Sequence, residues 1–103
     1  RQNETDAISY FGLMLMSGLG GPADPASGRQ WWSRGAAMGD GRCAFNLGIS
    51  HAGGHGGPQD LVKAWRWFRQ AERLGNPGAR AELDRIECAM NAEEQNRTVR
   101  RAS

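Results

Sequence analysis

The sequence predicts an all-α repeat protein of about two and a half units. Three observations support this prediction. The chain matches itself when it is shifted by 36 residues, one matching segment is a clear amphipathic helix, and glycine, proline and aspartate recur between the helical segments. A fixed period of roughly 20 to 50 residues is typical of proteins in which each unit buries its apolar face on its neighbour.

The amphipathic helix is expected over residues 61–74. On a helical wheel, its apolar side chains share one arc, while basic and polar side chains cover the other side. The apolar arc holds Leu61, Ala64, Trp67, Phe68, Ala71 and Leu74. Asp60 is placed to cap the start of this helix, and Gly75 is placed to end it.

The 36-residue shift superposes identical residues at positions that commonly punctuate structure. The pairs are Gly12 with Gly48, Gly18 with Gly54, Gly20 with Gly56, Gly21 with Gly57, Pro22 with Pro58, Asp24 with Asp60, Trp31 with Trp67, and Gly39 with Gly75. They predict repeats at about 7–42 and 43–78, followed by a partial third repeat at 79–95 that caps the domain. We therefore expect one domain over 1–96 and a disordered basic tail over 97–103.

The same punctuation sets the remaining helices. They are expected at about 6–17, 25–38, 41–52 and 77–94. Asp6 is expected to cap the first of them, and Pro25 occupies the N1 position that proline favours in the second. Gly12 and Gly48 fall inside helices, where glycine costs about 1 kcal/mol relative to alanine. We therefore expect neighbouring helices to approach closely at these two glycines.

These residues together resemble the Sel-one-like repeat (SLR) family, which is related to the tetratricopeptide solenoids. The second unit matches the family pattern at Cys43, Leu47, Gly48, Gly54, Gly56, Asp60, Ala64, Trp67, Phe68, Ala71 and Gly75. The first unit matches at Ala7, Phe11, Gly12, Gly18, Gly20, Asp24, Trp31, Trp32, Ala36 and Gly39. The resemblance covers about residues 7–90 and implies a right-handed α-solenoid of antiparallel helix pairs. The chain departs from the pattern at Gly21, Gly57, Gly28 and Asp84.

Composition argues against two classes of partner. The formal net charge is +2, which is too small to predict nucleic-acid binding. No apolar run reaches the length that a membrane-spanning helix needs. The sequence begins at Arg1 and not at an initiator methionine, so we expect a fragment or a processed form.

The histidines and cysteines do not predict a metal site or a cofactor. His51 and His55 are four residues apart, but His55 sits in a glycine-rich turn, and no cysteine or carboxylate near them in sequence completes a tetrahedral zinc site. His51 is expected to be a half-buried structural residue. Cys43 and Cys88 fall on different predicted helices, too far apart for a disulfide, and are expected to be buried free thiols.

An enzyme is the weaker alternative. Some cysteine-rich members of the family have been linked to penicillin binding, and a serine acyl-enzyme of that type needs a Ser-x-x-Lys element. None of the five serines tested for it, at positions 9, 17, 27, 33 and 50, has lysine three residues later. The Gly-x-Gly-Gly runs precede a proline and an aspartate cap, whose negative charge occupies the place that a phosphate would need.

The resemblance implies a concave groove lined by the first helix of each pair. Carried over by repeat position, the groove residues are Leu13, Met16, Phe45, Ile49 and Arg85, with Arg42 at the border. Such an apolar strip with a basic end suits an amphipathic helix or an extended peptide. An alternative stays open, in which Leu13, Phe45 and Ile49 pack between adjacent helices.

Two further surfaces are candidates. Trp65 lies outside the main apolar arc of its helix, so it is either an interface anchor or a cover for the neighbouring repeat. The first helix is apolar nearly all round, which predicts that something besides the second helix covers it. The candidates are further repeats before Arg1, a second chain (another copy or a partner) and a ligand; tolerated exposure is the alternative.

The resemblance implies a non-enzymatic adaptor or scaffold that binds a protein or peptide in bacterial envelope, secretion or signalling complexes. It leaves the compartment open between the periplasm or envelope and the cytoplasm. A sharper alternative is an immunity or regulatory protein that neutralises a bacterial toxin or hydrolase.

Overall fold

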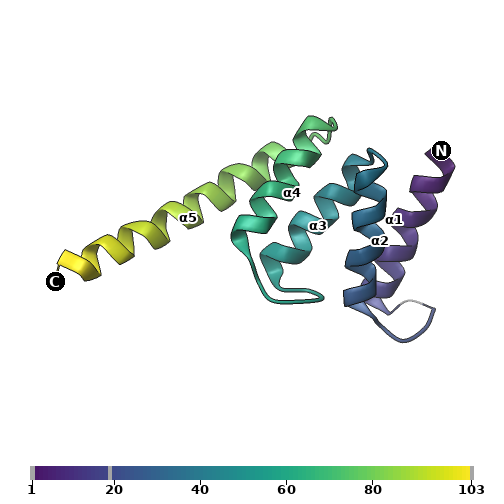
Figure 1. The fold of residues 1–103 in the computed structure, drawn as a ribbon, viewed down its shortest axis with the longest axis horizontal. Helices are drawn as coiled ribbons and strands as arrows, with labels where there is room; N and C mark the ends of the chain where they lie inside the picture. The colour runs from purple at the N-terminus through teal and green to yellow at the C-terminus, as the bar shows by residue number, and fades with distance from the viewer. Residues whose placement is uncertain (1, 19, 103) are drawn as a thin grey trace.

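The computed structural model describes the backbone of residues 2–18 and 20–102 and the side chains of residues 4–18 and 20–92. Five helices and no strand occur in these residues. They are α1 (Gln2–Ser17), α2 (Pro25–Ala37), α3 (Gly41–Gly53), α4 (Leu61–Arg73) and α5 (Ala79–Ala102). Each helix packs on the next one along the chain, and α5 extends away from the stack (Figure 1). The predicted all-α solenoid is therefore confirmed.

Aspartate caps start the three central helices. The Asp24 carboxylate accepts a hydrogen bond from the backbone N–H of Ser27 at 3.2 Å, and that of Asp60 accepts one from Lys63 at 3.0 Å. Asp40 does the same at the start of α3. Each carboxylate satisfies a backbone N–H that the helix itself leaves without a partner. These caps explain why the repeat carries aspartate at these positions.

Gly39 and Gly75 end the second helix of each pair. Their φ angles are +92° and +89°, a left-handed conformation that side chains with a Cβ adopt only with strain. Each glycine turns the chain into the helix that opens the next unit. The two turns are therefore equivalent, as their spacing of 36 residues requires.

The core runs through both units. One cluster of buried residues comprises Trp32, Ala36, Cys43, Ala44, Leu47, Ala71 and Ala79. The other comprises Ala64, Phe68, Leu83 and Ile86. Phe45 packs against both clusters, so it joins the two into one apolar layer. A continuous core of this kind is what makes stacked repeats stable as a set.

An aromatic ring of the second helix packs on the backbone glycine of each pair. A Cβ added at Gly12 would lie 2.4 Å from the Trp32 ring, and one added at Gly48 would lie 2.7 Å from the Phe68 ring. Trp32 also donates a hydrogen bond from Nε1 to the backbone oxygen of Ser9 at 3.1 Å. The helices thus approach closely at both glycines, because no side chain holds them apart.

The tryptophans shared by the two units are only half-buried. Trp31 makes an edge-to-face contact with Phe11, with ring centroids 5.0 Å apart, and the Arg34 guanidinium carbon lies 5.0 Å from the centroid of the Trp31 ring. Trp67 packs against the edge of the first cluster. It is the second aromatic of each adjacent pair, Trp32 or Phe68, that fills the core.

Two helix ends differ from the prediction. Helix α1 begins at Gln2, so Asp6 lies inside it and does not cap it; its carboxylate pairs with Arg42 instead. Helix α5 continues to Ala102, beyond the expected end near residue 94 and into the segment expected to be disordered. Residues 79–102 contain no glycine or proline to stop a helix. Residue 103 lies outside the described residues.

Candidate functional site

Three of the predicted groove residues occupy one repeat position and are exposed. Leu13 on α1 and Ile49 on α3 are 47% and 43% exposed, and Arg85 on α5 follows at the same spacing of 36 residues. The Arg85 guanidinium lies 3.7 Å from Glu82, an exposed pair that contributes little stability. We call Leu13, Ile49 and Arg85 the A-helix strip.

The other two predicted groove residues belong largely to the core. Met16 packs against the first core cluster, and Phe45 contacts Phe68 edge to face with ring centroids 5.4 Å apart. Both are only partly exposed. Leu13, Ile49 and Arg85 are therefore the accessible members of the predicted groove set. Of the three residues in the alternative of packing between helices, Phe45 contacts Phe68 on α4, whereas Leu13 and Ile49 stay exposed.

Arg42 links the two units. Its guanidinium pairs with the buried carboxylate of Asp40 at 2.6 Å and with that of Asp6 on α1. These two hydrogen-bonded carboxylates raise the pKa of Arg42 above its usual value. Burial alone would raise the pKa of Asp40, but hydrogen bonds from Arg42, Thr5 and the backbone of Cys43 outweigh it and lower that pKa. The charge of Arg42 is thus used within the fold.

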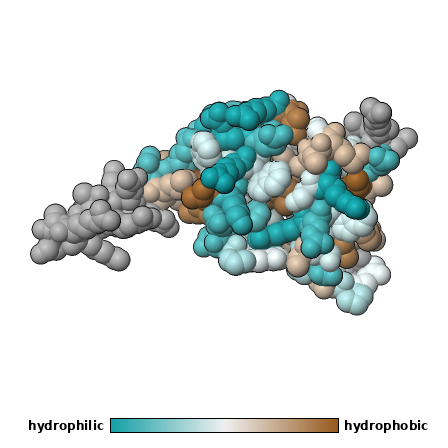
Figure 2. All heavy atoms as spheres, in the orientation of Figure 1, coloured by the Kyte–Doolittle hydropathy of each residue, from teal (hydrophilic) through white to brown (hydrophobic). Residues whose placement is uncertain are grey.

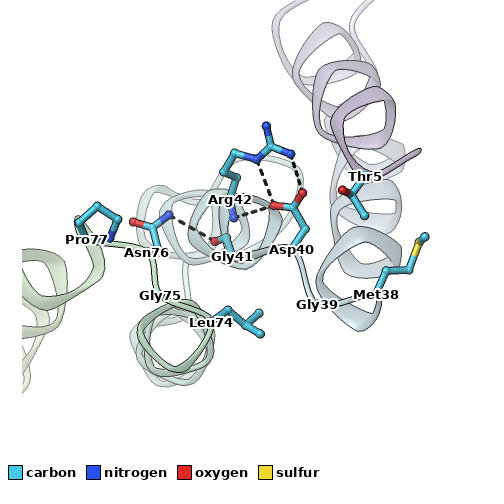
Figure 3. A pocket seen from close by; sticks show the side chains of 10 residues that line it. All are labelled: Thr5, Met38, Gly39, Asp40, Gly41, Arg42, Leu74, Gly75, Asn76 and Pro77. Atoms are coloured by element: carbon cyan, nitrogen blue, oxygen red, sulfur yellow. Dashed lines mark hydrogen bonds and ion pairs between the residues drawn. The ribbon is translucent and has the colours of Figure 1, made fainter. Parts of the chain in front are cut away.

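A surface depression lies beside this ion-pair cluster (Figure 3). It has a volume of about 590 Å³ and lies between the two equivalent turns, 38–42 and 74–77. The side-chain amide of Asn76 reaches from one turn to the other and donates to the backbone oxygen of Gly41 at 3.4 Å. The Arg42 and Asp40 side chains bind each other there, so the depression is a junction between units, without an unused charge pointing into it.

Trp65 connects α4 with α5. Its Nε1 donates a hydrogen bond to the Glu87 carboxylate at 3.0 Å, and Arg69 lies 5.3 Å from the ring centroid. The ring packs against the second core cluster. Of the two roles expected for Trp65, the structure favours a cover for the neighbouring helix, because its polar atom and one face are already engaged.

The outer face of α1 is an apolar surface that its repeat counterpart buries. Phe11 and Met14 are both 42% exposed, whereas Leu47 and Ser50, the residues 36 positions later, are 1% and 2% exposed. Ala7 is likewise exposed where Cys43 is buried. On α3, residues of α2 pack against Cys43 and Leu47, whereas on α1 Trp31 of α2 covers Phe11 only in part and leaves 42% of it exposed. Apolar residues gather at the α1–α2 end in Figure 2.

The histidines and cysteines form no metal site in the part of the chain that the structure describes. No three histidine, cysteine, aspartate or glutamate side chains come together there. Cys43 is buried, and burial raises the pKa of its thiol to about 11. Cys88 is exposed and not buried as expected. None of the described helices is long and apolar enough to cross a membrane.

Comparison with solved structures finds several similar chains, among them the following three. One is a Sel1 repeat protein from Oxalobacter formigenes, 28% identical, with a TM-score of 0.74; the match covers 80% of this chain and 34% of that one. Another is a protective antigen of uropathogenic Escherichia coli strains that displays an SLR fold, 32% identical, with a TM-score of 0.69 over 76% and 17% of the two chains.

The third is cysteine-rich protein B of Helicobacter pylori. It is 23% identical with a TM-score of 0.73, and the match covers 79% of this chain and 61% of that one. This likeness concerns the fold alone. The chain thus spans less than two thirds of the length of each of these three proteins. Among curated proteins, no sequence match was found.

The Sel1 repeat family matches residues 2–40 and 41–76. The boundary between these two matches falls at the Asp40–Gly41 turn, where the structure also separates one helix pair from the next. The two matches together cover well over half of the 103 residues. The chain therefore belongs to the Sel1 repeat family.

Proposed function

We propose that this chain is a non-catalytic interaction module that binds a peptide segment of a partner protein along the A-helix strip. Sel1 repeats are typically protein–protein interaction modules and generally have no enzymatic activity.

The observation that carries the proposal is the shared position of Leu13, Ile49 and Arg85. Large apolar side chains at the same position of two successive units stand exposed on α1 and α3, although each helix buries apolar residues elsewhere. Equivalent positions of stacked repeats lie on one face of a solenoid. The repeat therefore presents a row of accessible side chains and not isolated exposed residues.

The A-helix strip changes from apolar at one end to basic at the other. Two aliphatic side chains are followed by the Arg85 guanidinium, whose side chain is 78% exposed. A matching peptide carries apolar residues opposite Leu13 and Ile49 and an acidic residue opposite Arg85. An amphipathic helix or an extended segment can meet this pattern, so the strip sets side-chain chemistry and leaves the backbone conformation of the peptide free.

Selection of binding peptides from a random phage-displayed library tests the proposal. We expect selected peptides to bind the wild-type chain and to lose at least about tenfold in affinity with Ile49→Asp, because a buried charge would face the apolar peptide residue. Val62→Asp is the matched control, since Val62 is a similarly exposed apolar residue on α4, outside the strip. It should leave the affinity unchanged.

Arg85→Glu tests the direction of the strip. It should weaken peptides with an acidic residue at one end and leave purely apolar ones unaffected. Selected peptides that bind Ile49→Asp and Val62→Asp equally well would show that the strip is not the binding surface.

A further inference from the structure

A second cavity lies between α2 and α4, away from the A-helix strip. Its volume is about 590 Å³. Residues from three helices line it: Arg29, Gln30 and Ser33 from α2, Leu47 and His51 from α3, and Lys63, Arg66, Trp67 and Gln70 from α4. Its size is within the range of pockets that bind small ligands or short peptide segments, roughly 300 to 1,000 Å³.

The lining of this cavity carries three cations and no carboxylate. Arg29, Lys63 and Arg66 contribute positive charge, and none of them forms an ion pair with another described residue. Asp60 caps α4 and attracts Lys63, but it does not line the cavity. An uncompensated cationic cavity is unusual in a chain whose net charge is only +2, and it favours an anionic ligand.

Arg29 is held in place by the glycine-rich turn after α3. Its Nε donates to the backbone oxygen of His55 at 2.7 Å, and its Nη2 donates to that of Ser50 at 2.8 Å. A Cβ added at Gly57 would lie 2.7 Å from Nη1. The turn therefore fixes the guanidinium at the cavity without a competing carboxylate, and Gly57 leaves the space for it.

His51 adds an unsatisfied polar group to the same wall. Its Nδ1 is buried and has no hydrogen-bond partner among the described residues. Burial lowers the pKa of His51, and the positive charges of Arg29 on α2 and Lys63 on α4 lower it further, while Asp60 opposes them. The imidazole is thus neutral at pH 7, and the net charge around it is positive. An anion in the cavity would offset this positive charge and raise the pKa of His51 again.

The α4 wall has the length of a short extended segment. Lys63, Arg66, Trp67 and Gln70 follow the i, i+3, i+4, i+7 spacing of one helix face, which spans about 10 Å at 1.5 Å per residue. Three residues of extended chain span about the same distance, at roughly 3.3 to 3.6 Å each. Trp67 offers an apolar wall for the methylene groups of such a segment, and Gln30 and Gln70 offer amide hydrogen bonds.

We propose that this cavity is a second binding site, which takes an extended acidic segment of about three residues from a partner protein. The side-chain carboxylates of the segment bind Arg66, Lys63 and Arg29. The site uses none of the A-helix strip residues, so it does not depend on the function proposed above.

An NMR titration of the whole chain tests this site at near-physiological salt. The probe is the peptide Gly-Glu-Glu-Glu-Gly with blocked ends, and Gly-Gln-Gln-Gln-Gly is the uncharged control. We expect saturable shifts of backbone amides around Lys63 and Arg66 with the acidic peptide alone. Arg66→Gln should weaken binding at least about fivefold, because it removes a charge-assisted hydrogen bond.

Arg73→Gln is the matched control variant. Arg73 is exposed on the same helix but does not line the cavity, and its substitution makes the same change in net charge. At 0.15 M salt the screening length is about 8 Å, so a general charge effect should be small. Equal weakening by Arg66→Gln and Arg73→Gln would overturn the proposal, because binding would then follow overall charge.

Two further measurements show where the peptide binds and whether a free small-molecule carboxylate binds there instead. The pKa of His51 should rise when the acidic peptide saturates the site, and an unchanged pKa would place the peptide elsewhere and overturn the proposal. Free citrate tests a small-molecule ligand. Citrate binding more tightly than the peptide at the same amides would overturn the assignment of a peptide segment, as would equal binding of the glutamine peptide.

Discussion

The ring of Phe68 lies against the backbone of Gly48, so close that a Cβ added there would come within 2.7 Å of a ring carbon. Phe68 is fully buried and is a member of the second core cluster. Glycine at this position lowers the stability of the helix, but the packing of the large aromatic ring of Phe68 offsets this loss. This contact sets the distance between α3 and α4.

Gly48→Leu is expected to destabilise the chain by a few kcal/mol, on the order of 1 to 3. The leucine side chain would force Phe68 out of its place, which outweighs the roughly 1 kcal/mol that a better helix former gains. Urea unfolding monitored by circular dichroism measures the change in the free energy of unfolding. The helix-dominated spectrum itself should be retained.

Gly21→Leu is the control for this prediction. Gly21 lies in the turn between α1 and α2, and no atom lies within 4 Å of a Cβ added there. Its substitution should change the free energy of unfolding by less than about 0.5 kcal/mol. If Gly48→Leu were equally mild, α3 and α4 would not be in close contact at this position in solution.

Most of the fold could be predicted from the 36-residue period of the sequence. Glycines and aspartates recur at fixed spacing because each unit needs the same caps and turns, so the helices could be placed without knowing their contacts. The choice between Trp31 and Trp32 could not be made in this way. Adjacent residues on a helix differ by about 100° in direction, and the rotation of α2 about its axis depends on what it packs against.

Asp40→Asn tests the ion-pair junction between the units. Asparagine can still cap α3, as Asn76 does by accepting from Gly78 N–H at the equivalent turn, but it removes the charge that pairs with Arg42. We expect a loss of about 1 to 2 kcal/mol at pH 7. Urea unfolding of both proteins over a pH series gives this difference.

The difference should shrink in acid. The pKa of Asp40 is lowered in the folded chain, so its ionised form contributes stability above the unfolded carboxyl pKa of about 3.9 and loses it as pH falls through the folded pKa. Asp84→Asn is the control, since Asp84 is exposed and its ion pair with Arg80 should contribute under about 0.5 kcal/mol. A gap between wild type and Asp40→Asn that stays constant down to pH 2 would contradict the prediction.

The two cysteines should differ in reactivity. Cys43 is buried with a thiol pKa raised to about 11, so it is neither accessible nor ionised at pH 8, whereas Cys88 is exposed. Iodoacetamide at pH 8 should therefore modify one thiol per folded chain and two in urea, as counted by mass spectrometry. The Cys88→Ser variant should remain unmodified while folded, and rapid labelling of that variant would show that the core around Cys43 opens.

The candidate sites were harder to predict from the sequence than the fold was. Repeat position placed Leu13, Ile49 and Arg85 on equivalent helices, and their role in binding stays a prediction. The cationic cavity gave no local signal, because Arg29 and Lys63 are 34 residues apart and meet only when α2 and α4 flank α3. Contacts between different units depend on how the helices stack, which no single segment encodes.

The outer face of α1 is apolar and partly exposed. Phe11 and Met14 are exposed at positions where the second unit buries Leu47 and Ser50. At about 25 cal/mol per Å² of apolar surface, covering two such side chains would gain roughly 3 to 5 kcal/mol. We therefore expect the chain to self-associate through this face, with two copies of α1 covering each other.

Met14→Glu should weaken this association, because it places a charge in the apolar contact, and it should leave the helix content unchanged. Sedimentation velocity over a range of concentrations, with circular dichroism on the same samples, separates the two effects. Val62→Glu adds the same charge at a similarly exposed residue of α4, and its sedimentation should match that of the wild type. A wild-type chain that stays monomeric at high concentration, with no change in the sedimentation of Met14→Glu, would rule out self-association through this face of α1.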